Sequence, residues 1–216
     1  MIQIQKLTFN PFQENTYILF DETKECIIID PGCYDISEQN RLVEFIELNE
    51  LKPVKLVNTH GHIDHVLGNY FVSQKYNIEL YAHPNIEGLL DSIPSYSQQY
   101  GFNAYQMSPP PKHFLNQNDE LSFGKSSLKV LFCPGHSPDH IVFYSSDQHF
   151  VINGDVLFQG SFGRVDLPGG NFATLKKSII NIMFELPEST VVYCGHGGET
   201  TIGHEKQTNP ISYANF

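Results

Sequence analysis

The order of apolar and polar residues predicts alternating strands and helices along most of the chain. Near its start, runs rich in Ile, Tyr and Phe are separated by turn residues, and we expect antiparallel strands at residues 2–9, 16–21 and 25–30. Apolar residues at nearly helical spacing predict a helix at 36–51, which ends before Pro53. A strand at 54–59 and a helix at 66–76 follow.

The second half of the chain repeats this scheme. We expect strands at residues 127–133, 140–145, 149–154 and 190–194, and a helix at 172–186. Two such halves predict an α/β fold whose helices pack outside a pair of sheets. Residues 84–114 fit the scheme poorly, because closely spaced Ser and Tyr and three consecutive prolines follow a short helical stretch. We interpret this segment as an excursion over one edge of a single domain that spans residues 1–216.

Composition narrows the class of partner. The formal net charge is −11, which disfavours nucleic acid because such binding depends on Lys and Arg that displace counterions. We therefore expect a small-molecule substrate. The first ten residues lack a basic cluster followed by a long apolar run, and no stretch reaches the roughly 18 apolar residues of a membrane span. These features predict no membrane partner and a cytoplasmic protein, with homodimerisation left open; the four widely spaced cysteines are interpreted as free thiols.

Four side chains of the metal-ligand type lie together where the strand at 54–59 ends: His60, His62, Asp64 and His65. Residues two apart in an extended segment face one side, so His60 and His62 can address one point. Asp64 and His65 follow at the turn into the next helix and can reach a neighbouring point. Histidine with carboxylate is a ligand set of zinc or iron, and four such groups suit two adjacent cations better than one. A polar loop with surface histidines is the alternative, but it accounts poorly for this spacing.

Three further residues of this type follow predicted strands, each beside a glycine: His136, Asp155 and His196. Ligands collect beyond the carboxyl ends of strands in α/β sheets, so we expect all seven residues to converge on one crevice. Any one of the three would be an ordinary turn residue by itself. Their joint occurrence with the cluster at 60–65 favours a metal site.

These motifs resemble the metallo-β-lactamase superfamily, whose fold is a four-layered αβ/βα sandwich. Within the superfamily, three runs resemble the short, glyoxalase II-like branch of thioester hydrolases: Gly-Asp-Val-Leu-Phe at 154–158, Gly-Ser-Phe-Gly-Arg at 160–164 and Gly-His-Gly at 195–197. The resemblance extends from about Asn15 to Pro210, which is nearly the whole chain.

The resemblance implies a ligand assignment: His60, His62 and His136 on one ion, Asp64, His65 and His196 on the other, and Asp155 as the bridge between them. It implies two divalent ions per chain, zinc first, with iron or manganese as alternatives. Two departures from glyoxalase II proper leave glutathione open as part of the substrate. No C-terminal helical region that helps to hold glutathione is expected after Pro210, and Asp166 stands where a tyrosine is typical.

The expected reaction is hydrolysis of a thioester or ester of the S-acylglutathione type by a metal-bridged hydroxide. Two cations roughly 3.5–4 Å apart lower the pKa of a shared water, and a metal ion stabilises the oxyanion that forms at the acyl carbon. Asp64 is the candidate catalytic residue, because it is placed to orient this hydroxide and to take its proton.

The main alternative is a persulfide dioxygenase, which shares this fold and much of this motif but uses one iron held by two histidines and an aspartate. A lactonase or a β-lactamase would be a hydrolytic variant of the leading interpretation. A non-enzymatic metal-binding role is the least favoured alternative, because it would not explain why all seven ligand-type residues are present.

Three residues outside the ligand set carry open alternatives. Arg164 either holds a substrate carboxylate through a two-pronged pair or pairs with Asp166 and shapes its turn. Asp30 either supports a ligating histidine or caps a turn. His140 either steadies the site or is satisfied by the backbone.

Overall fold

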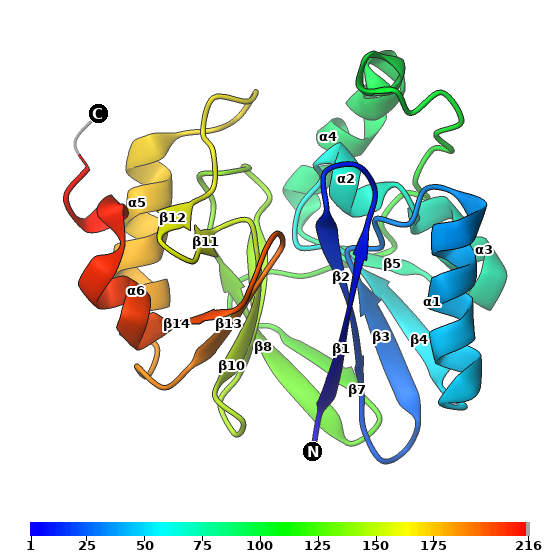
Figure 1. The fold of residues 1–216 in the computed structure, drawn as a ribbon, viewed down its shortest axis with the longest axis horizontal. Coiled ribbons are helices and arrows are strands. Elements are labelled where there is room, and N and C mark those ends of the chain that lie inside the picture. The colour runs from blue at the N-terminus through cyan, green and yellow to red at the C-terminus, as the bar shows by residue number, and fades with distance from the viewer. Residues whose placement is uncertain (215–216) are drawn as a thin grey trace. The chain divides into compact units, whose positions relative to one another are not determined.

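The structure is a computed structural model that describes residues 1–214. The chain divides into two compact units: unit 1 comprises Met1–Leu115 and Ser122–Ser126, and unit 2 comprises Asn116–Leu121 and Ser127–Phe216. One six-stranded sheet belongs to unit 1 and a second is built mainly from unit 2, each with its own helices (Figure 1). Within residues 1–214, no helix has both the length and the apolar character needed to cross a membrane. The interpretation of residues 1–216 as one domain stays a prediction.

The sheet of unit 1 has the strand order β1-β2-β3-β4-β5-β6. Its strands are β1 (Gln3–Phe9), β2 (Glu14–Phe20), β3 (Glu25–Ile29), β4 (Lys52–Val57), β5 (Leu80–Ala82) and β6 (His113–Phe114). The first three strands pair antiparallel, as predicted, and the pairs from β3 to β6 are parallel. Parallel neighbours need a crossover, and the helices of unit 1 provide it.

The first crossover is helix α1 (Ile36–Leu48). Its N-cap is Asp35, whose carboxylate accepts a hydrogen bond from the backbone N–H of Glu38 at 2.9 Å. Leu42 and Ile46 of α1 are buried in one apolar cluster with residues of β2, β3 and β4. Burying such a side chain contributes roughly 1.5–3 kcal/mol, and this holds α1 along the sheet (Figure 1).

The single helix predicted at 66–76 is divided in the structure into α2 (Ile63–Val66) and α3 (Asn69–Tyr76). A tertiary contact explains the break. The backbone N–H of Gly68 donates to the carbonyl oxygen of Pro31 at 2.7 Å, and a Cβ at this position would lie 2.6 Å from the sulfur of Cys33. Only glycine permits that approach, so the loop after β3 sets where α2 ends.

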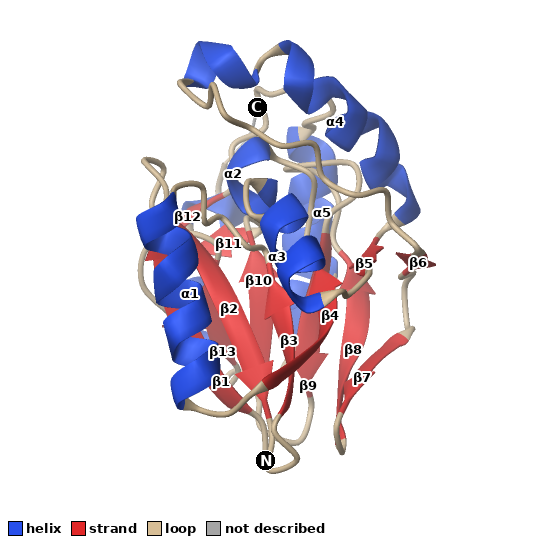
Figure 2. Cartoon of the chain, turned by 90° about the vertical axis from the view of Figure 1, so that its right-hand side faces the viewer, coloured by secondary structure: helices blue, strands red, loops and turns tan. Residues whose placement is uncertain are grey.

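The excursion at 84–114 departs from the sheet plan, as predicted. It consists of short helices, η1 (Pro84–Ile86), α4 (Glu87–Ser92), η2 (Ile93–Ser95) and η3 (Ser97–Tyr100), and it ends in β6. Figure 2 shows these helices above the strands of their sheet. Ile86 and Ile93 are fully buried in the core of unit 1, so the segment is anchored rather than loosely draped.

The second sheet has the strand order β14-β13-β10-β9-β8-β7. Its strands are β7 (Glu120–Phe123), β8 (Ser126–Phe132), β9 (Ile141–Ser145), β10 (Phe150–Gly154), β13 (Val191–Cys194) and β14 (Thr200–Thr201). β10 and β13 are parallel, whereas β8, β9 and β10 pair antiparallel. The four strands predicted in this half are confirmed, with boundaries within one residue.

Unit 2 also contains a small hairpin that the sequence did not predict, formed by β11 (Leu157–Phe158) and β12 (Ser161–Phe162). The helix predicted at 172–186 is shorter: α5 (Phe172–Asn181) is followed by η4 (Met183–Glu185). The chain continues into α6 (Ile202–Thr208) and η5 (Pro210–Ser212). Leu175 and Ile179 of α5 are fully buried against the second sheet's apolar cluster.

Candidate metal centre

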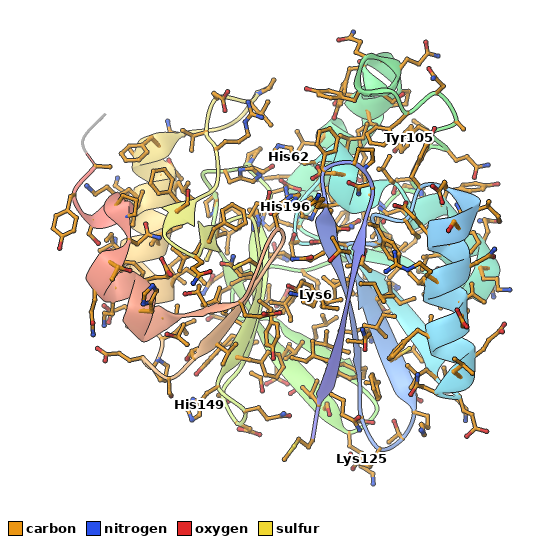
Figure 3. The ribbon with its side chains drawn as sticks, viewed as in Figure 1. Lys6, His62, Tyr105, Lys125, His149 and His196 are labelled. Carbon is orange, nitrogen blue, oxygen red and sulfur yellow. The ribbon has the colours of Figure 1, made fainter. Side chains whose placement is uncertain are left out.

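Unit 1 presents four of the predicted ligands on the loop that follows β4; we call His60, His62, Asp64 and His65 the first donor set. His62 is extended (φ −71°, ψ 147°) and forms the N-cap of α2, so His60 and His62 precede the helix and Asp64 and His65 lie in it. The ring centroids of His60 and His62 are 4.7 Å apart, and those of His60 and His65 are 4.3 Å apart. His60 and His65 are fully buried, whereas His62, labelled in Figure 3, is partly exposed.

The protonation of His60 follows from its neighbours. The hydroxyl of Thr59 donates a hydrogen bond to Oδ2 of Asp30 at 2.6 Å. The Thr59 oxygen can therefore only accept from Nδ1 of His60, which lies 3.0 Å away. Nδ1 of His60 then carries the proton, and Nε2, which lies 3.1 Å from Nδ1 of His62, keeps the lone pair that a metal ligand requires.

His65 is held in the same tautomer. Its Nδ1 lies 3.1 Å from Oδ2 of Asp30, and a carboxylate oxygen accepts, so Nδ1 carries the proton. Nε2 of His65 faces Oδ2 of Asp64 at 3.6 Å. A carboxylate that orients the far nitrogen of an imidazole is typical of a metal-binding histidine.

Asp30 supports these histidines rather than competing with them for a metal. Its ligand atoms lie within 4.8 Å of those of His60 and His65, but both oxygens are engaged. Oδ1 accepts from the Thr59 backbone N–H at 2.7 Å and from Nδ2 of Asn58 at 3.3 Å, and Oδ2 accepts from Thr59 and His65. Asp30 adopts φ 51° directly after β3, an uncommon conformation for a residue with a side chain. Of the two sequence interpretations of Asp30, the structure favours the support of a histidine.

A buried carboxyl group that the sequence did not single out lies beside His65. Glu14, at the start of β2, is fully buried, and its Oε1 is 3.9 Å from Nδ1 of His65. Burial raises the pKa of Glu14 well above its usual range, and the proximity of His65 only partly offsets this. Asp30 and Asp64 raise the pKa of this carboxyl further. The available signal was a polar start to an otherwise apolar strand.

In unit 2, Asp155 leaves the sheet at an irregularity. The pairing of β10 with β13 loses register between Ile152 and Gly154, and Gly154 adopts φ 51°. The backbone N–H of Asp155 then donates to Nε2 of His140 at 3.0 Å. His140 is fully buried, so both sequence interpretations apply in part: the backbone pairs with its Nε2, and this contact orients Asp155.

His136 is fixed by the chain that leaves the small hairpin. Its Nδ1 lies 2.7 Å from the carbonyl oxygen of Arg164. A carbonyl can only accept, so Nδ1 carries the proton and Nε2 keeps its lone pair. A Cβ at Gly163 would overlap the carbonyl oxygen of Asp155 and lie 2.9 Å from Nδ1 of His136, so this close approach requires glycine.

The three predicted ligands of unit 2, the second donor set, are His136, Asp155 and His196. Oδ2 of Asp155 lies 3.5 Å from Nε2 of His136 and 3.5 Å from Nε2 of His196. Two ligands of one cation, with bonds of about 2.1 Å at a tetrahedral angle, are about 3.4 Å apart. These separations are therefore those of ligand pairs around a cation, and they are longer than an N–H···O hydrogen bond. Both donor sets fit a divalent metal ion.

His196, also labelled in Figure 3, is the most accessible of the three, because its side chain is 28% exposed. Phe158 of β11 packs edge-on to its ring at 6.2 Å between centroids. The hairpin therefore contacts His196 through Phe158, and the chain that leaves the hairpin contacts His136 through Arg164.

Arg164 forms the pair that one sequence interpretation described. Its Nε and Nη2 donate to the two carboxylate oxygens of Asp166 at 2.8 and 2.7 Å. This hydrogen bonding lowers the pKa of Asp166 to about 2. Both side chains are largely exposed, at 62% and 67%, so a substrate carboxylate could reach Arg164 only in competition with Asp166.

The fold and the two donor sets define a class of protein. A sequence profile of the metallo-β-lactamase superfamily matches residues 9–196, and the chain belongs to this superfamily. The fold class expected from the motifs is thereby confirmed.

Three relatives show the range of this class. The chain is 34% identical over 211 residues to hydroxyacylglutathione hydrolase GloC of Haemophilus influenzae, covering 97% of this chain and 98% of that protein. The structure is similar to that of BLEG-1, a B3 metallo-β-lactamase, with a TM-score of 0.89, 33% identity and coverage of 98% and 100%. It is also similar to TTHA1623 in a di-iron-bound form, with a TM-score of 0.85, 35% identity and coverage of 95% and 98%. The prediction that this chain belongs to a superfamily of metallo-hydrolases is confirmed. Its substrate and its metal content stay predictions.

Proposed function

We propose that this protein is a binuclear metal-dependent hydrolase that cleaves a thioester or ester of the glyoxalase II-like, S-acylglutathione type. The observation that supports it best is the position of Asp155, whose Oδ2 faces Nε2 of His136 and Nε2 of His196 at 3.5 Å each. The similarity to a hydroxyacylglutathione hydrolase over nearly the full chain supports a thioester substrate.

The proposed centre unites the two donor sets, on the strength of the motif resemblance. The proposed ligands are His60, His62 and His136 for one ion, Asp64, His65 and His196 for the other, and Asp155 as the bridge. The hydrogen bonds that leave Nε2 with a lone pair on His60, His65 and His136 support this assignment. Zinc is the proposed metal, with iron and manganese as alternatives. The di-iron-bound form of TTHA1623 supports iron.

Two bound divalent cations would supply Lewis acidity toward an acyl oxygen and would lower the pKa of a water molecule. The remaining work falls to side chains of this chain. Asp64, whose side chain is 15% exposed, is proposed to orient the attacking water and to hold its proton. Asp30 and Thr59 keep the Nδ1 atoms of His65 and His60 protonated and hydrogen-bonded, so these rings serve as ligands and not as proton acceptors.

The proposal includes a small-molecule substrate, no nucleic-acid or membrane partner, and a cytoplasmic protein, with a homodimer left open. The net charge of −11 supports the exclusion of nucleic acid.

The test combines metal content with two assays on the same preparation. Elemental analysis should return two ions per chain, and the loaded protein should hydrolyse S-lactoylglutathione or a simple thioester that lacks glutathione. Activity on both thioesters would show that the substrate need not contain glutathione. One iron per chain together with oxygen consumption on glutathione persulfide would replace the hydrolase by a dioxygenase. Hydrolysis of a lactone or a β-lactam in place of both thioesters would keep the mechanism and change the substrate.

A further inference from the structure

Three aromatic side chains of unit 1 pack against one another at the excursion. The rings of Phe12 and Tyr100 meet edge-on at 5.9 Å between centroids, and those of Tyr96 and Tyr100 at 5.8 Å. Phe12 comes from the loop between β1 and β2, whereas both tyrosines come from the excursion. We call Phe12, Tyr96 and Tyr100 the aromatic wall.

The aromatic wall is tied to the turn that carries Asp64. Nδ2 of Asn10 donates to the carbonyl oxygen of Asp64 at 3.0 Å, and Oδ1 of Asn10 accepts from the backbone N–H of Phe12 at 3.0 Å. One asparagine side chain therefore joins the loop of the wall to the turn of the first donor set.

Two of the three rings of the wall are exposed although they are aromatic, whereas Tyr96 is partly buried against the core of unit 1. Phe12 is 41% exposed and Tyr100 is 49% exposed, while their neighbour Phe102, 5.8 Å from Phe12, is only 2% exposed. Buried Phe102 anchors this cluster, and the rings of Phe12 and Tyr100 keep part of their surface exposed. Exposed apolar groups gathered beside polar catalytic residues are typical of a binding surface.

Hydrogen bonds hold residues 104–108, which follow the wall in the chain, in place. The backbone N–H of Ala104 donates to the hydroxyl of Tyr34 at 2.8 Å, and that of Ser108 donates to the hydroxyl of Tyr105 at 3.2 Å. Nδ2 of Asn69 in α3 donates to Oγ of Ser108 at 2.8 Å. Tyr105 is labelled in Figure 3. A surface ordered before binding loses less conformational entropy when a ligand arrives.

We propose that the aromatic wall receives an aromatic or flat apolar group of the substrate, in its acyl or its thiol part. This inference rests on the proposed hydrolase function and adds a substrate class to it. A second copy of the chain is the weaker occupant, because the hydrogen bonds of Asn10 link the wall to Asp64, the residue that would act on the substrate.

The test measures a specificity ratio. Phenylacetyl and acetyl thioesters of one small thiol vary the acyl part, and acetyl thioesters of benzyl and ethyl mercaptan vary the thiol part. The wild type should prefer the aromatic member of at least one pair. Loss of a stacking ring should lower that kcat/KM ratio roughly tenfold in Tyr100→Ala, whereas Tyr100→Phe should preserve it. Phe12→Leu, which keeps apolar volume without a ring, should lower the same ratio.

Tyr213→Ala is the matched control, because Tyr213 is 77% exposed in the C-terminal segment; the ratio should stay at the wild-type value. A wild type without aromatic preference, or ratios unchanged in both wall variants, would overturn the wall and leave the hydrolase standing.

If the metal-loaded wild type cleaves no thioester, the proposed function fails. Calorimetric titration with phenylacetate and with acetate then tests separately whether the aromatic wall binds an aromatic group. Saturable binding of phenylacetate alone, weakened in Tyr100→Ala, supports an aromatic subsite. Equal or undetectable binding of both acids overturns it.

Discussion

The carbonyl oxygen of Arg164 accepts a hydrogen bond from Nδ1 of His136 at 2.7 Å. The chain that follows the small hairpin therefore sets the tautomer of a proposed ligand 28 residues earlier. Glu205 of α6 and Asn209, the C-cap of α6, hold this hairpin in place through hydrogen bonds. Oε2 of Glu205 accepts from the backbone N–H of Gly160 at 3.0 Å, and Nδ2 of Asn209 donates to the carbonyl oxygen of Ser161 at 2.8 Å.

The first prediction concerns Glu205, which is fully buried and also accepts from Thr200 and Asn209. Glu205→Gln replaces one acceptor oxygen by an NH₂ group that faces donors. We expect a loss of about 1–3 kcal/mol in the free energy of unfolding, measured by urea denaturation, together with weaker metal binding measured by titration. Glu188→Gln, at an exposed position, is the control. Equal stability of the two variants would show that α6 does not hold the hairpin.

A second prediction follows from Asp155. If its carboxylate bridges the two ions, Asp155→Ala should lose both metals and lower kcat by about 100-fold or more, because each ion loses a ligand. Elemental analysis after dialysis measures the first effect and thioester hydrolysis the second. Asp147→Ala removes an exposed aspartate of the same unit and should retain both ions. Full metal content in Asp155→Ala would show that the bridge assignment is wrong.

The third prediction concerns the pH dependence of stability and rests on Asp21. Burial raises the pKa of this carboxyl, but hydrogen bonds from Thr23, Ser126 and Lys125 outweigh burial and lower the pKa well below its usual range. A lowered folded-state pKa contributes stability above the unfolded value, near 3.9, and this contribution is lost as the pH falls through the folded value.

Asp21→Ala should therefore lower the free energy of unfolding by about 2–3 kcal/mol at neutral pH. The difference from wild type should shrink as the pH drops below about 4. Denaturant titrations at pH 7 and pH 3 measure both quantities, with Asp91→Ala, exposed in α4, as the control. A difference that is independent of pH would contradict the ionic origin of the effect.

The fourth prediction separates the two interpretations of Arg164. As a substrate anchor, its loss in Arg164→Ala should raise KM for a carboxylate-bearing thioester with kcat nearly kept, and should hardly affect a neutral ester. Asp166→Asn should lower KM for the charged substrate, because the carboxylate that now occupies the guanidinium is removed. Steady-state kinetics on both substrates measure these effects. Equal changes on charged and neutral substrates would leave Arg164 as a residue that shapes its turn.

Sequence alone determined the elements that carry the proposed ligands. His60, His136, Asp155 and His196 each follow a strand whose apolar pattern is local, so strand ends and ligand spacing could be read without a fold. The family resemblance added the assignment of ligands to ions, which no local pattern contains.

Only the tertiary structure decided how these side chains are oriented, because their partners lie far away in the chain. The tautomer of His65 depends on Asp30, 35 residues earlier, and the break between α2 and α3 depends on Pro31 and Cys33 packing against Gly68. Periodicity reports how one segment divides its residues between core and solvent. It cannot report which distant donor forms a hydrogen bond with which acceptor. Those hydrogen bonds protonate Nδ1 of the proposed histidine ligands and leave the lone pair on Nε2.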